Sequence, residues 1–254
     1  MAEQLYPLLF SEHFLQHRLA QRYQQDLEAL RPRAQAAWED LRKRWEKEKG
    51  FLASLSESDL EKRWVCPLLE ALWPESWLSQ VQWGGQRADF AFYRNPQERD
   101  AAKPGNANPF DQAVAVGEVE KWGTDLDKGK ESPHGQICRY LRELPPQWGL
   151  LTNGRLWRLY AQNVRTAERS FFTFDLVDML ERQDQEAFLR FFFLLEQQAF
   201  LTDRLARIQE ESNLFVVGVS QALSRQVFHA LEAIVNGWAT RYPETAQSLS
   251  LIHI

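Results

Sequence analysis

Two glutamates separated by one valine end an apolar segment of the chain. The segment is AVAVGEVE, residues 113–120, and the glutamates are Glu118 and Glu120. Alternate residues of a strand point the same way, so the two carboxylates lie side by side and repel each other. That repulsion costs stability unless a positive charge lies between them. The pattern therefore raises the question of what neutralises this pair.

A third carboxylate comes from the preceding strand. The segment RADFAFY, residues 87–93, alternates with a period of two and places Asp89 near its centre. If the two strands are neighbours, Asp89, Glu118 and Glu120 converge at one edge of the sheet. Carboxylate oxygens are hard ligands that suit Mg²⁺, and the bound ion keeps positions open for water and a phosphate oxygen. The plain alternative is a glutamate pair that faces solvent at the end of a strand.

The elements around these strands indicate an α/β fold. The pattern predicts a helix, three strands, a helix, three strands and further helices, hence a mixed sheet flanked by helices. Pro32 should interrupt the helical pattern of residues 11–49, and Ser58 with Glu61 fits a capping box that begins the next helix. The remaining predicted elements are a loop at 94–112, a helix at 134–143, two strands joined by an Asn-Gly turn at 148–160, a strand at 170–176, and helices at 185–199 and 201–238.

Composition narrows the class of protein. The 254 residues carry a formal net charge of −5, which argues against strong DNA binding by this chain alone but leaves room for a catalytic module. We see neither a signal peptide nor a membrane span, and Cys66 and Cys138 are expected to stay reduced, so we expect a cytoplasmic protein. A nucleotide-binding enzyme is disfavoured, because the sequence has no GxGxxG or GxxxxGK[ST] motif.

In combination these features resemble the PD-(D/E)XK nuclease superfamily. Asp89 matches its first acidic residue, with Ala88 in place of the usual proline, and Glu118 matches the second. The usual lysine falls at position 120, where this chain has Glu120, while the adjacent Lys121 should point to the opposite face. The resemblance implies a Mg²⁺-dependent endodeoxyribonuclease, with Mn²⁺ as a substitute, that acts on double-stranded DNA and leaves a 5′-phosphate and a 3′-hydroxyl.

The likeness is closest to type IIG-like bifunctional restriction–modification enzymes. It spans roughly residues 8–238 and rests on LFSEHFLQHRL, GEVEKWGTDLDKG, GQICRYL, WGLLTNGRLWRLY and the stretch that begins EESNLFVVGVSQAL. It implies an N-terminal helical segment (1–50), a nuclease-like core (51–180), a helical connector (181–240) and a truncated or artefactual tail (241–254). Methyltransferase and target-recognition domains, with S-adenosylmethionine bound to the methyltransferase, would then belong to a missing C-terminal part.

The same resemblance assigns further residues to the site. Gln136 and Tyr140 match a Q-x3-Y pattern, and Glu61 matches a glutamate that lies near the metal in some relatives. Each has a plainer reading: Glu61 as the capping partner, Gln136 as a solvent-facing residue and Tyr140 as part of the core. The candidate DNA contacts are Lys121, Lys128, Lys130, Arg139, Arg142 and Tyr140, although ordinary surface charge explains the cations equally well. Asp125 and Asp127 read as a solvated loop, and His134 as a surface residue.

Two other functions remain open at this point. Glu120 could mark a decayed nuclease that only binds DNA or positions partners. A helical adaptor for another subunit is the second alternative, with an aromatic interface made by Phe188, Phe191, Phe192 and Phe193, although core packing fits these residues better.

Overall fold

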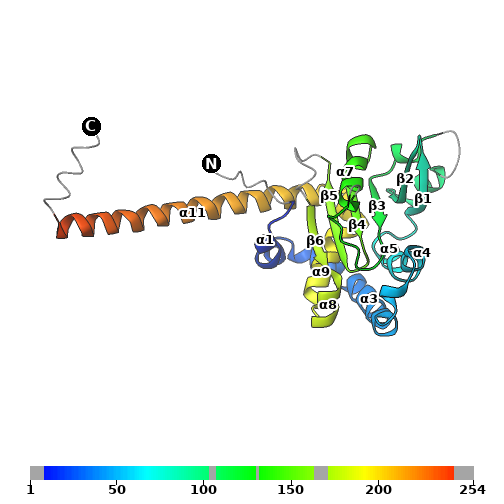
Figure 1. Ribbon diagram of the computed structural model, residues 1–254, viewed down its shortest axis with the longest axis horizontal. Coiled ribbons are helices and arrows are strands. Elements are labelled where there is room, and N and C mark those ends of the chain that lie inside the picture. Colours follow the sequence, from blue (N-terminus) through cyan, green and yellow to red (C-terminus); the bar gives the residue numbers. More distant parts are fainter. Residues whose placement is uncertain (1–8, 103–106, 130–131, 163–170, 243–254) are drawn as a thin grey trace. The chain divides into compact units, whose positions relative to one another are not determined.

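The structure, a computed structural model, describes residues 9–102, 107–129, 132–162 and 171–242, the side chain of residue 239 excepted. Internal contacts divide the chain into two compact units, Met1–Glu210 and Glu211–Ile254. The first unit contains a six-stranded mixed sheet with helices, so the predicted α/β class is confirmed (Figure 1). The finer domain boundaries expected from the sequence stay predictions.

The strands occupy the sheet in the same order as in the chain. They are β1 (Trp77–Trp83), β2 (Gln86–Phe92), β3 (Ala115–Val119), β4 (Trp148–Thr152), β5 (Leu156–Ala161) and β6 (Phe171–Asp175). All neighbours are antiparallel except β3 and β4, which are parallel and joined by the crossover helix α7 (Pro133–Glu143). A parallel pair requires such a crossover, and a hairpin cannot make one. The strands of segments 87–93 and 113–120 are neighbours, which is the condition under which Asp89 and Glu118 can converge.

Helices precede the sheet in two groups. The first comprises α1 (Glu12–His17), α2 (Leu19–Arg22) and α3 (Gln24–Glu48), and the second comprises η1 (Leu52–Ser54), α4 (Glu57–Leu60), the π-helical η2 (Glu61–Val65) and α5 (Cys66–Leu72). The expected interruption at Pro32 is wrong, because α3 runs through it. A proline removes one hydrogen bond of the helix, but α3 buries residues on both sides of it, including Leu27, Leu30 and Trp38.

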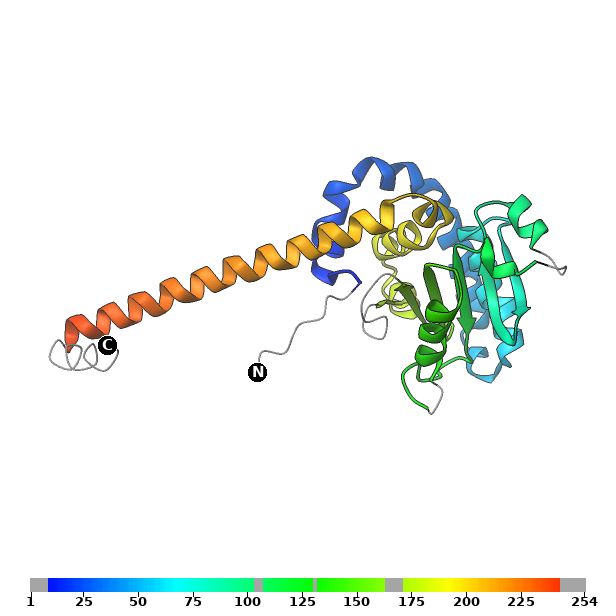
Figure 2. The same cartoon turned by 90° about the horizontal axis from the view of Figure 1, so that it is seen from above.

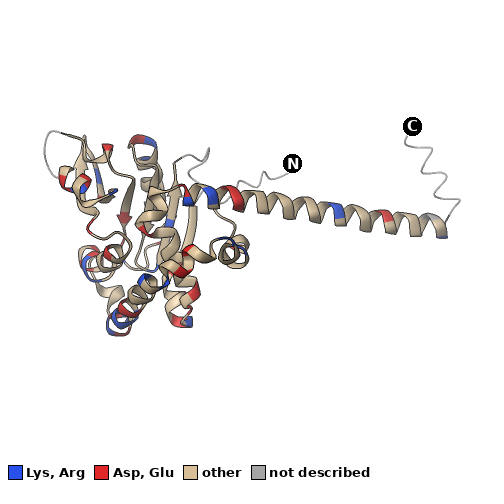
Figure 3. Ribbon diagram, turned by 180° about the vertical axis from the view of Figure 1, so that it is seen from behind, with Lys and Arg blue, Asp and Glu red and all other residues tan. Residues whose placement is uncertain are grey.

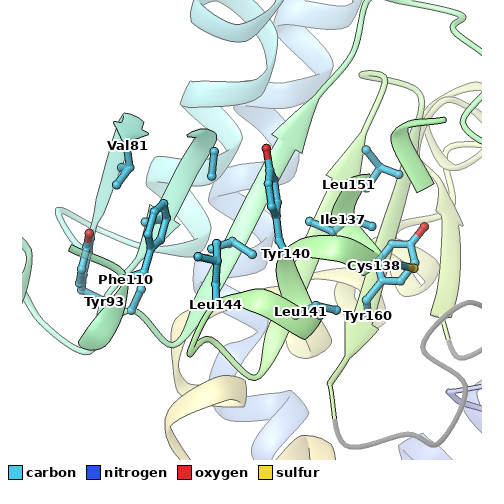
Figure 4. Close-up of a cluster of buried hydrophobic side chains, with 14 of the residues drawn as sticks. Val81, Tyr93, Phe110, Ile137, Cys138, Tyr140, Leu141, Leu144, Leu151 and Tyr160 are labelled. Atoms are coloured by element: carbon cyan, nitrogen blue, oxygen red, sulfur yellow. The ribbon is translucent and has the colours of Figure 1, made fainter. Parts of the chain in front are cut away.

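One face of the sheet is covered by α7. Side chains from α7, β2, β3 and β5 pack there into one apolar cluster, in which Tyr93, Val116, Ile137 and Tyr160 are fully buried. Figure 4 shows Tyr140 standing among these side chains. On this face the positions of Asp89 and Glu118 continue the rows of Ala91 and Val116, because alternate residues of a strand share a face. Asp89 and Glu118 therefore lie at the edge of the apolar cluster, on the same face of the sheet.

The other face is aromatic and is covered by later helices. These helices are α8 (Leu176–Arg182), α9 (Gln185–Leu195) and α10 (Gln197–Leu201), which Figure 2 shows beside the sheet. Phe191 packs edge-on against Trp157, with ring centroids 5.8 Å apart. The Phe residues of α9 are fully buried, so the preference for core packing is confirmed and they offer no interface for an adaptor.

Two short helices and one long helix complete the description. The short ones are α6 (Pro96–Ala101) and η3 (Pro109–Asp111), and the long one is α11 (Arg204–Arg241). Cys66 and Cys138 remain thiols, as expected. Among the residues the structure describes, no helix is both long enough and apolar enough to cross a membrane.

Candidate functional site

Asp89 and Glu118 stand opposite each other at the centre of the sheet. The pairs Phe90–Gly117 and Ala91–Val116 set a register in which these two acidic positions face each other across β2 and β3. Both are buried, with 9% of Asp89 and 7% of Glu118 exposed. The backbone N–H of Val119 donates a 2.9 Å hydrogen bond to Asp89 Oδ2. Strand pairing therefore places two carboxylates next to each other in the protein interior.

The carboxyl group of Glu118 is poorly solvated. Within the described part of the chain, no donor makes a hydrogen bond to its buried Oε1 atom. Burial, followed by the negative charge of Asp89, raises the pKa of Glu118 to about 9. At neutral pH this group therefore keeps its proton unless a cation takes the proton's place.

Glu120 and Lys121 lie just after β3, although the sequence predicted that this strand would include Glu120. β3 ends at Val119, and the Glu120 N–H donates to the Thr152 carbonyl oxygen at 2.8 Å. Glu120 is half-buried, and its pKa is raised by burial and then by the charges of Glu57 and Asp89. Its carboxylate thus belongs electrostatically to the same group. Lys121 is exposed, and its charge opposes the rise in the pKa of Glu57.

Glu61 does not serve as a capping residue. The N-cap of α4 is Ser56, whose hydroxyl accepts from Asp59 N at 3.2 Å, so the predicted capping box of Ser58 and Glu61 is wrong. Glu61 instead begins the π-helical turn η2 and is buried, with 8% exposed. Burial and then the charge of Asp89 raise its pKa, which places Glu61 beside the carboxylates of the sheet. Single π-helical turns are frequent at functional sites.

Three residues near the carboxylates were missed by the sequence reasoning. Gln80 lies in β1, a strand for which the alternation gave no range, and its side-chain amide contacts both Glu61 and Asp89. Glu57, in the first turn of α4, has a pKa raised by burial and then by Asp89, while Arg87 is an exposed cation whose charge opposes that rise. Their only signal in the sequence was polarity at positions beside predicted strands and helices, which is too common to be specific.

Gln136 and Tyr140 connect α7 to the same group. The Gln136 amide donates to the Tyr140 hydroxyl at 2.8 Å, and that hydroxyl donates to the backbone oxygen of Arg87. Burial and then the charge of Glu118 raise the pKa of Tyr140. With 2% of its surface exposed, Tyr140 is part of the core with its hydroxyl at the rim. The DNA contact expected of Tyr140 stays a prediction.

The remaining candidate DNA contacts differ in their surroundings. Lys128 is exposed and pairs with Asp125 at 2.8 Å, and the Arg139 guanidinium lies 5.8 Å from the centroid of the Tyr140 ring. Lys130 lies outside the described residues.

Asp127, expected to belong to a solvated loop, accepts two 2.7 Å hydrogen bonds from the buried Arg158, so it also anchors that loop to β5.

His134, expected to be a surface residue, is half-buried in α7, and its Nδ1 atom lies 3.0 Å from the Tyr160 hydroxyl. This contact joins α7 to β5.

The carboxylates of this site are the kind of ligand that a hard divalent cation prefers, but their positions do not surround a single point. Within the described residues, no group of three or more His, Cys, Asp and Glu side chains is arranged to hold a metal ion as it stands. Carboxyl groups of Glu61, Asp89 and Glu118 nevertheless lie near one another on three different elements, and in the described part of the chain one buried oxygen of Glu118 lacks a donor. Comparison of the chain with protein-family models, with curated proteins and with solved structures gave no match.

Proposed function

We propose that this chain is a PD-(D/E)XK-type nuclease domain that hydrolyses phosphodiester bonds of double-stranded DNA with Mg²⁺. The observation that carries the proposal is the buried Glu118 Oε1 atom, which lacks a hydrogen-bond donor in the described part of the chain and whose residue stands opposite Asp89. A buried carboxylate oxygen without a donor is costly when the group is ionised, and a divalent cation at that oxygen would remove the cost.

The elements also occur in the order that the resemblance implies, which is a helix, three antiparallel strands, a helix and a further strand. A helical segment is followed by the antiparallel strands β1, β2 and β3, by the crossover helix α7 and by the parallel strand β4. The acidic residues come from β2, from β3 and from the helical segment before the sheet. This agreement supports the proposed class, and the two reduced cysteines agree with action in the cytoplasm.

Each carboxylate has a distinct role in the proposal. Asp89 and Glu118 would hold the cation, and Glu61 would support it from η2. When bound, Mg²⁺ polarises the scissile phosphate and lowers the pKa of a coordinated water. Glu120, half-buried beside Asp89, would complete the metal site or orient the attacking water in place of the usual lysine. Gln136 would fix the position of the Tyr140 side chain, which lines the site next to Glu118.

Nicking of supercoiled plasmid at low salt with Mg²⁺ or Mn²⁺ tests this function. We expect Asp89→Ala to lower the rate about a hundredfold or more, because it removes a metal ligand. Asp26→Ala changes an exposed aspartate of α3 and is the matched control, with an expected rate equal to that of the unaltered protein. Circular dichroism establishes that both variants fold. Unchanged cleavage by a folded Asp89→Ala protein would rule out the assignment.

A decayed nuclease that only binds DNA is the second candidate. The half-buried Glu120 favours it, because this position adds negative charge to a site that must receive a phosphate. In the same plasmid assay, cleavage by Glu120→Lys but not by the unaltered protein would establish this candidate. Cleavage by the unaltered protein would exclude it.

A further inference from the structure

Gln80 has an unusual backbone conformation in the middle of β1. Its φ angle is 55°, in the left-handed region that residues other than glycine rarely adopt. The strand pairs regularly on either side of it, through Ser79–Phe90 and Val81–Ala88, so Gln80 lies opposite Asp89. Such a conformation costs free energy and persists only where the surroundings hold it. The cause must therefore lie in the contacts of this one residue.

The side-chain amide of Gln80 is held at both ends. Its Nε2 group donates to Asp89 Oδ1 at 3.3 Å and to Glu61 Oε2 at 3.5 Å. Its Oε1 atom accepts a hydrogen bond from the guanidinium of Arg87. A guanidinium can only donate, so the oxygen of the amide faces Arg87 and the two N–H groups face the carboxylates. This orientation follows from the neighbours on both sides.

The amide of Gln80 thus lies between two carboxylates that come from different elements, Glu61 from η2 and Asp89 from β2. Its N–H groups carry partial positive charge, and they satisfy oxygens that a cation would otherwise bridge. Glu118, opposite Asp89 on the other side, retains a buried oxygen without a donor within the described residues. The amide therefore takes up the space between Glu61 and Asp89 and makes hydrogen bonds to both.

We infer that the Gln80 amide occupies the position between Glu61 and Asp89 at which a divalent cation would bind, and that a cation binds by displacing the amide from both carboxylates. The inference rests on the proposed metal site and assigns Gln80 as a positioning residue of that site. Release of the amide allows β1 to regain an extended conformation at residue 80. Gln80 thereby lowers the affinity of the site while keeping the carboxylates correctly placed.

The consequence for affinity has a definite sign. A cation must break two hydrogen bonds from Gln80 before it can bind, so a variant without these donors should bind the cation more tightly. Because the two bonds are long, we expect Mn²⁺ to bind about three- to tenfold more tightly when they are absent. A residue that ligates the cation would show the opposite change, and a residue with only a structural role would show none.

Isothermal titration of the full chain with Mn²⁺ tests the inference. Gln80→Met keeps the volume of the side chain and removes its donors, while Gln80→Gly removes the donors and the backbone strain together. Gln82→Met is the matched control, because Gln82 is an exposed glutamine of the same strand. Thermal unfolding in chelator and in Mn²⁺ provides a second readout, since tighter binding raises the melting temperature further.

Each outcome separates the two proposals. Tighter Mn²⁺ binding by both Gln80 variants, with Gln82→Met unchanged, supports the inference. Measurable binding by the Gln80 variants, but not by the unaltered protein, supports it as well. Equal or weaker binding by the Gln80 variants overturns the inference and leaves the proposed metal site in place. Absence of Mn²⁺ binding by the unaltered protein and by every variant overturns both.

Discussion

Glu118 occupies a position at which the fold disfavours a negative charge. It lies in the sheet opposite Asp89, and burial together with that charge raises its pKa to about 9. The carboxyl group therefore keeps its proton in the folded protein at pH values where the unfolded chain has lost it. In the absence of a cation, the folded state holds more protons than the unfolded state between about pH 4.5 and about pH 9.

This difference predicts how stability depends on pH. Because the folded state binds the extra proton, the free energy of unfolding should fall as the pH rises from about 4.5 to about 9. Glu118→Gln removes the titrating group, so the decline should be shallower in that variant. Urea unfolding in chelator at several pH values measures both slopes. The exposed Glu39→Gln on α3 is the control, and an identical slope in Glu118→Gln and the unaltered protein would contradict the prediction.

At the scale of elements, the turn between β4 and β5 fixes the segment that follows β3. Gly154 has a φ angle of 84°, and a Cβ atom there would lie 2.7 Å from the ring of Trp122. The Trp64 indole N–H donates to the Gly154 carbonyl oxygen at 2.8 Å. Trp122 comes two residues after Glu120, so the packing at this turn helps to place the end of β3.

We therefore expect Gly154→Ala to be strongly destabilising. The left-handed backbone and the overlap with the Trp122 ring together should lower the free energy of unfolding by about 2–4 kcal/mol. Gly50→Ala is the control, because Gly50 does not need a positive φ angle and its added Cβ meets nothing within 4 Å. Denaturant unfolding compares the two variants. Equal stabilities of Gly154→Ala and Gly50→Ala would show that the turn relaxes without cost.

At the scale of the whole molecule, the second compact unit is notable for its apolar surface. Every side chain described between Val216 and Trp238 is exposed, and Leu223, Val227, Leu231 and Ile234 recur there at helical spacing. Figure 3 shows few charged residues along this part of α11. Exposed apolar surface of this extent in a helix favours association with other apolar surfaces.

Removal of this segment should improve the solution behaviour of the protein. We expect the full chain to associate with itself at micromolar concentration, and a chain that ends at Phe215 to be monomeric. The melting temperature of the shorter chain should stay close to that of the full chain, because exposed side chains contribute little packing. Light scattering coupled to size exclusion, with calorimetry, measures both. A monomeric full chain at these concentrations would contradict the expectation.

The sequence by itself determined the elements that depend on local pattern. A period of two located β2, an apolar run located β3, and an Asn-Gly pair located the turn between β4 and β5. The alternation within β2 and β3 also singled out Asp89 and Glu118, because a charged residue inside an apolar strand is conspicuous. These features follow from interactions between residues close in the chain, which a sequence displays directly.

Tertiary structure decided the features that depend on distant neighbours. The burial of α3 on both sides of Pro32 outweighed the preference of proline for ending a helix. Glu61 fits a capping box by local pattern, yet the π-helical turn carries it toward Gln80 and Asp89. The role of Gln80 was invisible because it arises from contacts with η2, β2 and Arg87 together. Burial, charge and backbone strain at such a site are set by long-range packing, which no short segment of sequence contains.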